Sequence, residues 1–143
     1  MQPQNFDEVI QRIISRDSRY HRDAYFFLRE GLDHTQKRLV EGKRAEPRHV
    51  TGQELLRGLR DYALGQFGPM AKTVLNEWGI RTCEDFGEIV FNMVDEGLLS
   101  KTENDSREDF GGGFEFDEAF LKPFLPPSRT EVKAAPETKA GSL

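Results

Sequence analysis

The sequence has few of the residues that commonly build metal and cofactor sites. Its 143 residues include a single cysteine, Cys83, which excludes a disulfide framework and a zinc site made of several cysteines. The three histidines, His21, His34 and His49, do not have the spacing of metal ligands, and there is no H-E-x-x-H motif. We therefore expect no resident cofactor and no metal ion.

The sequence also lacks a long hydrophobic run. The longest stretch without a charged residue is the ten residues from Tyr62 to Ala71, whereas a membrane-spanning helix needs about 20 predominantly apolar residues. The first residues, MQPQNFDEVIQR, contain acidic residues and no apolar segment typical of a signal peptide. We therefore expect a cytoplasmic protein that has no membrane partner.

Basic residues are scarce in one part of the chain. Residues 82–121 contain twelve acidic and two basic residues, so this segment carries a net charge of −10, whereas the whole chain carries only −5. The rest of the chain is therefore basic on balance. An asymmetry of this kind indicates how a protein interacts with partners rather than how it folds.

Two helices are predicted for the N-terminal part, over about residues 4–15 and 20–40. Each segment has apolar residues at the three- and four-residue spacing of an amphipathic helix. A linker that contains Gly42 and Pro47 follows, because both residues commonly end helices. We expect residues 1–42 to form a helical pair.

Three further helices are predicted between residues 51 and 97, because this segment contains start and stop signals in pairs. A capping box begins the first helix, a Gly-Pro pair separates the first from the second, and glycines end the second and the third. These signals are Thr51 with Glu54, Gly68 with Pro69, Gly79, Thr82 and Gly97.

The spacing of apolar residues changes after Gly97. Phe114 and Phe116 alternate with acidic residues, which is typical of a half-buried strand and predicts a β-hairpin over about residues 98–117. The three consecutive glycines at 111–113 leave the register of this hairpin open. Three helices followed by a hairpin are typical of a winged helix.

The predicted fold class is therefore mostly α with a small β-hairpin. Two N-terminal helices pack on a winged-helix-like unit over residues 51–117, and together they form one globular domain over residues 1–125. Residues 126–143 contain almost no apolar side chains to bury, so they are predicted to form a flexible tail.

The third helix of this unit is predicted to have an acidic face. At about 100° per residue, one arc of the helix collects the residues Glu84, Asp85, Glu88, Asn92, Asp95 and Glu96. This face would repel DNA phosphates, so we do not expect the helix to bind DNA. Two interpretations stay open: a solvated face that aids solubility, and a docking surface for a basic protein.

The first functional hypothesis is a non-enzymatic interaction or adaptor module, alone or as a homodimer, that binds a basic protein through this acidic face. The alternative is a nucleic-acid-binding regulator that uses the basic 37–48 segment. Its basic residues are Lys37, Arg38, Lys43, Arg44 and Arg48.

A third hypothesis is an enzyme with a site near Glu30 and His34. These residues are four positions apart, so they share one face of a predicted helix. No nucleophile or other catalytic motif accompanies them in the sequence. We therefore expect no enzymatic activity.

Several separate segments together resemble a known family. They are YHRDAYFFLREGLDHT from Tyr20, TGQEL from Thr51, QFGPMA from Gln66, DFGEIV from Asp85 and FGG from Phe110. In this order they resemble, over about residues 5–120, a conserved hypothetical family restricted to planctomycete and verrucomicrobial bacteria. The resemblance implies a bacterial, intracellular protein. The family has no assigned activity, so it supplies no catalytic or binding residue.

Overall fold

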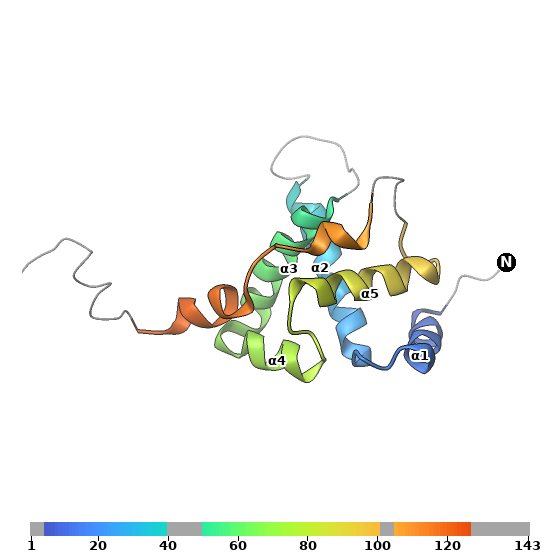
Figure 1. Ribbon diagram of the computed structural model, residues 1–143, viewed down its shortest axis with the longest axis horizontal. Coiled ribbons are helices and arrows are strands. Elements are labelled where there is room, and N and C mark those ends of the chain that lie inside the picture. Colours follow the sequence, from blue (N-terminus) through green and yellow to red (C-terminus); the bar gives the residue numbers. More distant parts are fainter. Residues whose placement is uncertain (1–4, 40–49, 101–104, 127–143) are drawn as a thin grey trace, which may run out of the picture.

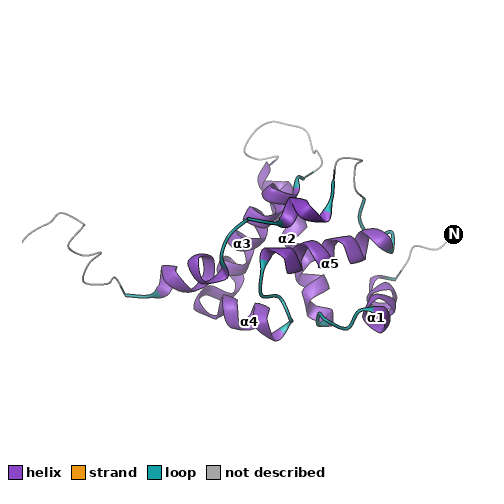
Figure 2. Ribbon diagram, in the orientation of Figure 1, coloured by secondary structure: helices purple, strands orange, loops and turns teal. Residues whose placement is uncertain are grey.

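The computed structural model describes residues 5–39, 50–100 and 105–126, and the regular structure in these ranges is entirely helical (Figure 2). Five α-helices follow one another, and short 3-10 and π-helical turns complete the C-terminal segment. The α-helices are α1 (Phe6–Arg16), α2 (Arg22–Leu39), α3 (Gly52–Phe67), α4 (Ala71–Glu77) and α5 (Cys83–Asp95). The five helices predicted from periodicity are confirmed.

Helices α3 and α5 begin at the residues that were expected to cap them. The Thr51 hydroxyl accepts the Glu54 N–H at 3.2 Å, and the Glu54 carboxylate accepts the Thr51 N–H at 3.0 Å. Thr82 and Asp85 form the same reciprocal pair at the start of α5. Because such caps satisfy N–H groups that have no partner inside the helix, they define where α3 and α5 start.

The turn after α4 requires a glycine. Gly79 has a φ of 92°, and a methyl group at this position would overlap the backbone carbonyl of Arg19. The same turn is bonded to the start of α2, because the His21 N–H donates to the Trp78 carbonyl at 3.0 Å. The turn between α4 and α5 therefore packs directly against the turn between α1 and α2.

The centre of the fold is the contact between α2 and α3, with α5 lying across both helices (Figure 1). Gly58 of α3 lies so close to Thr35 of α2 that a methyl group on Gly58 would overlap the Thr35 side chain. The Thr35 hydroxyl donates to the Gly31 carbonyl at 2.7 Å, and a methyl group on Gly31 would overlap the Leu59 side chain. Small residues on both helices therefore allow this close approach.

The predicted hairpin is wrong in the part of the chain that the structure describes. Residues 107–110 form a 3-10 helix, residues 117–121 form a π-helix, and no strand occurs in the described ranges. The backbone N–H and carbonyl of Phe114 are both bonded to the Cys83 sulfur at 3.4 Å instead of to a second strand. The described part of this unit therefore shows no winged helix.

The C-terminal segment packs on α5 and α3 at glycines. A methyl group on Gly87 of α5 would lie 2.9 Å from the Phe110 Cβ, and one on Gly113 would lie 2.7 Å from a methyl carbon of Leu56. Phe110 and Phe116 are buried, and the ring of Phe116 lies 5.8 Å from that of Phe86. The alternating Phe114 and Phe116, whose spacing is typical of a strand, therefore pack a segment without regular structure against the core.

Two predicted segments cannot be compared with the structure. The Gly42–Arg48 linker and residues 127–143 of the predicted tail lie outside the described residues. The predicted extent of the globular domain, residues 1–125, stays a prediction.

Candidate functional site

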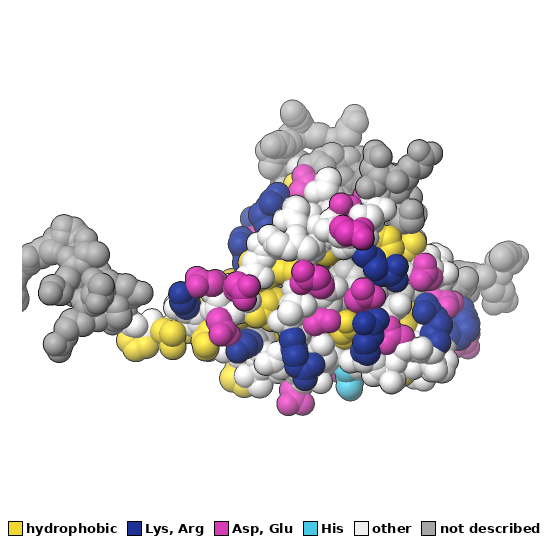
Figure 3. All heavy atoms as spheres, in the orientation of Figure 1, with side chains coloured by type: hydrophobic (Ala, Val, Ile, Leu, Met, Phe, Trp, Pro, Cys, Tyr) yellow, Lys and Arg dark blue, Asp and Glu magenta, His cyan; other side chains and the backbone are white. Residues whose placement is uncertain are grey.

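The six residues of the predicted acidic face lie along α5, but they do not form an open acidic surface. Of the six, Glu84 and Asp95 are exposed, and they lie near opposite ends of the helix. Asp85, Glu88 and Glu96 are half-buried, and Asn92 is buried. The space-filling view shows basic side chains interspersed among acidic ones on the visible face (Figure 3).

Arginines from other parts of the chain pair with two of these acids. Arg19 and Arg107 contact the Glu88 carboxylate at 3.2 and 3.3 Å. Arg12 and Arg16 of α1 contact the two oxygens of the Glu96 carboxylate, both at 3.4 Å. Two of the five carboxylates on this helix face are therefore paired with arginines of the same chain.

Two further residues of the predicted acidic face, Asp85 and Asn92, form hydrogen bonds within the chain. Asp85 accepts the N–H groups of Arg81 and Thr82 and the Tyr20 hydroxyl, the last at 2.6 Å. Asn92 donates from its amide nitrogen to Asp17 at 3.0 Å, and it donates to the Tyr25 hydroxyl at 3.1 Å. These contacts join α5 to the segment between α1 and α2 and to α2 itself.

The electrostatics of this contact follow from burial and pairing. Hydrogen bonds from the Arg19 guanidinium hold the pKa of Asp17 well below its usual value, and the Asn92 amide acts in the same direction. Burial raises the pKa of Tyr20, and the adjacent Asp85 raises it further. Burial also raises the pKa of Tyr25. Both tyrosines therefore stay protonated as hydrogen-bond donors or acceptors at neutral pH.

Replacing Asp17 with asparagine should lower the free energy of unfolding by about 1.5 kcal/mol at pH 7, the typical value of a hydrogen bond to a charged group. A carboxylate whose pKa falls on folding stabilises the fold above its unfolded pKa of about 3.9, and this contribution is lost as the pH decreases further. The difference between variant and wild type should therefore shrink between about pH 4 and pH 2. Urea unfolding followed by circular dichroism at several pH values measures this difference in the free energy of unfolding.

The exposed Asp95 provides the control for this measurement, because Asp95→Asn makes the same chemical change on the surface of α5. Its effect should stay within about 0.5 kcal/mol at each pH. An Asp17→Asn effect that is equally large at pH 2 and pH 7 would contradict the role given to the carboxylate.

A surface that the sequence interpretation missed lies at the end of the C-terminal segment. The large hydrophobic side chains that are exposed among the described residues are Met70, Leu121, Phe124 and Leu125, which are 55%, 39%, 44% and 53% exposed. Met70 ends the 3-10 helix Gly68–Met70, and Leu121 ends the π-helix Asp117–Leu121, which contacts it. Phe124 and Leu125 lie at the end of the next 3-10 helix, Lys122–Phe124, which contacts the π-helix. We call these four residues the C-terminal apolar patch; hydrophobic side chains gather at this end in Figure 3.

Charged side chains border the C-terminal apolar patch. Glu115, Asp117 and Glu118 are exposed and directly precede Leu121. Lys72 pairs with Asp117 at 2.7 Å, and Lys122 pairs with Glu118 at 2.6 Å. A partner would therefore encounter apolar side chains beside exposed carboxylates.

Glu30 and His34 line an open groove of about 910 Å³ along α2. The Tyr62 hydroxyl donates to Glu30 at 3.0 Å, and the rings of His34 and Tyr62 are 5.3 Å apart. Burial and the neighbouring Glu30 raise the pKa of Tyr62, so its hydroxyl stays protonated. The described lining residues of the groove include no serine, threonine or cysteine to act as a nucleophile.

The described residues contain no group of three or more His, Cys, Asp or Glu side chains that could hold a metal ion. Cys83 is buried, and burial raises the pKa of its thiol. Of the basic 37–48 segment, Lys37 pairs with Asp33 at 3.1 Å and Arg38 with Asp61 at 2.8 Å. Its residues Lys43, Arg44 and Arg48 lie outside the described residues.

None of the helices in the described ranges is both long and apolar enough to cross a membrane. Comparison of the chain with models of protein families, with curated proteins and with solved structures gave no match.

Proposed function

We propose that the chain is a non-enzymatic protein-interaction module that binds a basic partner through the C-terminal apolar patch and its acidic border. The observation that supports this proposal is that the exposed large hydrophobic side chains among the described residues all lie at one end, in or directly after three short helical elements, and the middle one of these contacts the other two. Exposed apolar side chains gathered in one place are typical of interaction surfaces.

The chemistry of the patch defines the partner. Phe124 and Leu125 offer an aromatic and an aliphatic anchor, side chains that contribute strongly when an interface buries them. The exposed Glu115 attracts a partner that carries lysine or arginine beside its own apolar side chains. Such a partner would compete with Lys72 for Asp117 and with Lys122 for Glu118. The proposal therefore keeps the basic partner expected from the charge of residues 82–121.

The proposed surface differs from the one first predicted on α5. On α5, Glu88 and Glu96 are paired with arginines of the same chain, so a basic partner would have to displace these arginines. At the C-terminal apolar patch the apolar side chains are already exposed. Nucleic-acid binding through the basic 37–48 segment stays an untested alternative.

The experiment is capture of partners from the organism's own cells with the tagged full chain at two salt concentrations. Phe124→Asp should reduce the captured partner about tenfold or more, because it places a charge at an apolar anchor. Lysine substitutions at Glu115 and Glu118 should reduce capture at low salt more than at high salt, because salt screens charge attraction. Binding of the identified partner is then measured with purified proteins.

The control variant is Gln11→Asp on α1, which makes an exposed side chain acidic at the opposite end of the fold (Figure 1). It should capture as much partner as the wild type. Equal capture by Phe124→Asp and the wild type would contradict the proposal. A mass of twice 16.4 kDa in sedimentation equilibrium, lost in Phe124→Asp, would instead identify the occupant as a second copy of the chain.

A further inference from the structure

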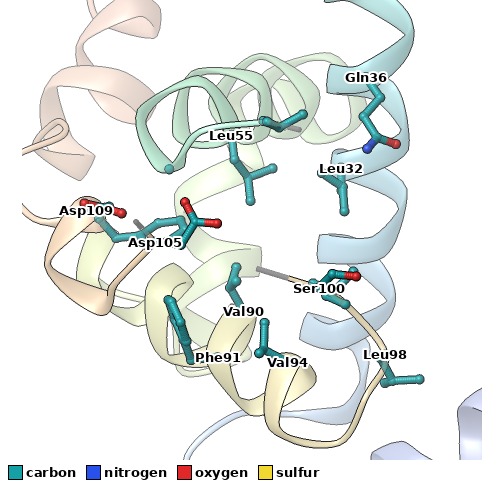
Figure 4. Close-up of a pocket in the computed structure, with 14 residues that line it drawn as sticks. Leu32, Gln36, Leu55, Val90, Phe91, Val94, Leu98, Ser100, Asp105 and Asp109 are labelled. Carbon is teal, nitrogen blue, oxygen red and sulfur yellow. The ribbon is translucent and has the colours of Figure 1, made fainter. Parts of the chain in front are cut away.

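A pocket of about 370 Å³ lies between α2, α3, α5 and the residues that follow α5 (Figure 4). It is separate from the C-terminal apolar patch, because the two sets of lining residues have no member in common. The volume falls in the range of ligand pockets, which are commonly about 300–1,000 Å³.

Most of the described lining side chains are aliphatic or aromatic. They come from all the surrounding elements, so the pocket has an apolar wall on several sides. These side chains are Leu32, Val50, Leu55, Val90, Phe91, Val94, Leu98, Leu99 and Phe110. A ligand in this pocket would bury an apolar body.

The polar lining groups lie at the edges of this apolar surface. Figure 4 shows Asp105 on one side, and Gln36 and Ser100 on the other, with Leu55 and Val90 between them. The charged residues among the described lining residues are acidic, Asp105 and Asp109. A carboxylate accepts up to about four hydrogen bonds, so Asp105 can accept one from a ligand in addition to its contacts within the chain.

Hydrogen bonds and close packing hold the acidic wall in place. Asp109 accepts the Ser106 N–H at 2.9 Å, and its carbonyl accepts the Gln53 side-chain N–H at 2.8 Å. A methyl group on Gly52 would lie 2.9 Å from the Asp109 Cβ. Because Asp109 is fixed against the start of α3, a ligand would meet a preformed surface on this side of the pocket.

We infer that this pocket binds a small apolar amine, with its protonated nitrogen at Asp105 and its hydrocarbon body among the side chains of α2, α3 and α5. The apolar wall favours the hydrocarbon body, and the carboxylates favour a cation and oppose an anion. Gln36 and Ser100 offer hydrogen bonds to a second polar group at the far end of a longer ligand. The inference does not depend on the proposed protein partner.

The test compares three probes that share one hydrocarbon chain: n-octylammonium, n-octanol and n-octanoate. Binding to the full chain is measured from changes in the NMR signals of the methyl groups. Octylammonium should bind at least about tenfold more tightly than octanoate, with shifts at Leu55 and Val90. Octanol should bind between the two.

Two variants locate the binding. Asp105→Asn should remove the preference for octylammonium over octanol, because it keeps the shape of the side chain and removes its charge. Val94→Phe should weaken binding of all three probes by filling the pocket. Val74→Phe on α4 is its matched control, because Val74 is also half-buried and lies outside the pocket. Thermal unfolding shows whether each variant is folded. If a variant is unfolded, the comparison of the three probes on the wild type still tests the inference.

Three results would overturn the inference. The first is the absence of octylammonium binding up to about 5 mM, a very weak affinity for a preformed pocket. The second is octanoate binding as tightly as octylammonium. The third is shifts confined to Leu121 and Leu125, which would place the probe on the C-terminal apolar patch instead.

Discussion

Replacing Asn92 with aspartate is expected to lower the free energy of unfolding by about 3–5 kcal/mol at neutral pH, the typical cost of a buried charge without compensation. Asn92 is 3% exposed, and its amide nitrogen donates to Asp17 at 3.0 Å and to the Tyr25 hydroxyl at 3.1 Å. Aspartate would replace this donor with a second carboxylate beside Asp17. Two carboxylates so close together strongly oppose each other's ionisation.

The measurement is urea unfolding of the Asn92→Asp variant and the wild type between pH 4 and pH 8. The deficit should shrink as the pH falls, because the buried carboxyl group can take up a proton and donate to Asp17 again. The control is Asn5→Asp at the N-cap of α1, where aspartate is as good a cap as asparagine. Equal stabilities of the two variants at pH 7 would show that Asn92 does not connect α5 to Asp17.

Replacing Gly58 with alanine is expected to destabilise the fold by about 1–3 kcal/mol, the usual cost of adding a methyl group to a well-packed contact. The new methyl group would overlap the side chain of Thr35. Thr35 cannot easily turn away, because it is buried and its hydroxyl donates to the Gly31 carbonyl at 2.7 Å. Relief therefore requires α2 and α3 to move apart.

Gly65 provides a matched control, because it lies in the same helix and a methyl group there would have no atom within 4 Å. Gly65→Ala should stabilise the protein by about 0.5–1 kcal/mol through helix propensity alone. In the double variant Gly58→Ala with Thr35→Gly, the methyl group on residue 58 has space. The loss in free energy of unfolding should therefore be smaller than the sum of the losses of the two single variants. Additive effects of the two substitutions in thermal or urea unfolding would exclude a direct contact.

The helices could be predicted because their signals are local. The capping pairs at Thr51 and Thr82 and the glycines at 79 and 97 each act within a few residues, and the apolar spacing defines one face of each helix. The prediction of a hairpin was wrong because the backbone partners of a strand are not a local signal. Alternating phenylalanines show that one side of a segment is buried, but not what bonds its backbone, and here a cysteine side chain does.

The pairing of Glu88 and Glu96 on the acidic face could not be predicted from the sequence, because their arginine partners include residues distant in sequence. Arg12 and Arg16 lie 84 and 80 positions before Glu96. Their spacing on the polar side of the first helix was visible, and so was the positive balance of charge outside residues 82–121. Nothing local indicates that α1 packs beside the end of α5, which only tertiary packing determines.

The C-terminal apolar patch could have been found from composition. Ala119–Leu125 contains five apolar residues besides proline, and so short a segment cannot bury all of them on one side. The structure buries Ala119 and Phe120 and leaves Leu121, Phe124 and Leu125 exposed. The number of apolar residues therefore indicates that some of them are exposed. Which of them are exposed depends on how the π-helix packs.

The pairing of α1 with α5 has a consequence for synthesis. Arg12 and Arg16 leave the ribosome about 80 residues before Glu96, and translation at about 5–20 residues per second makes this interval roughly 4–16 s. During that time α1 can pack on α2, while its arginines remain without their acidic partners. Residues 1–81 carry 14 basic and 11 acidic residues, so the nascent chain has a net charge of +3 until residues 82–121, which carry −10, are made. The net charge of the chain therefore changes sign late in synthesis.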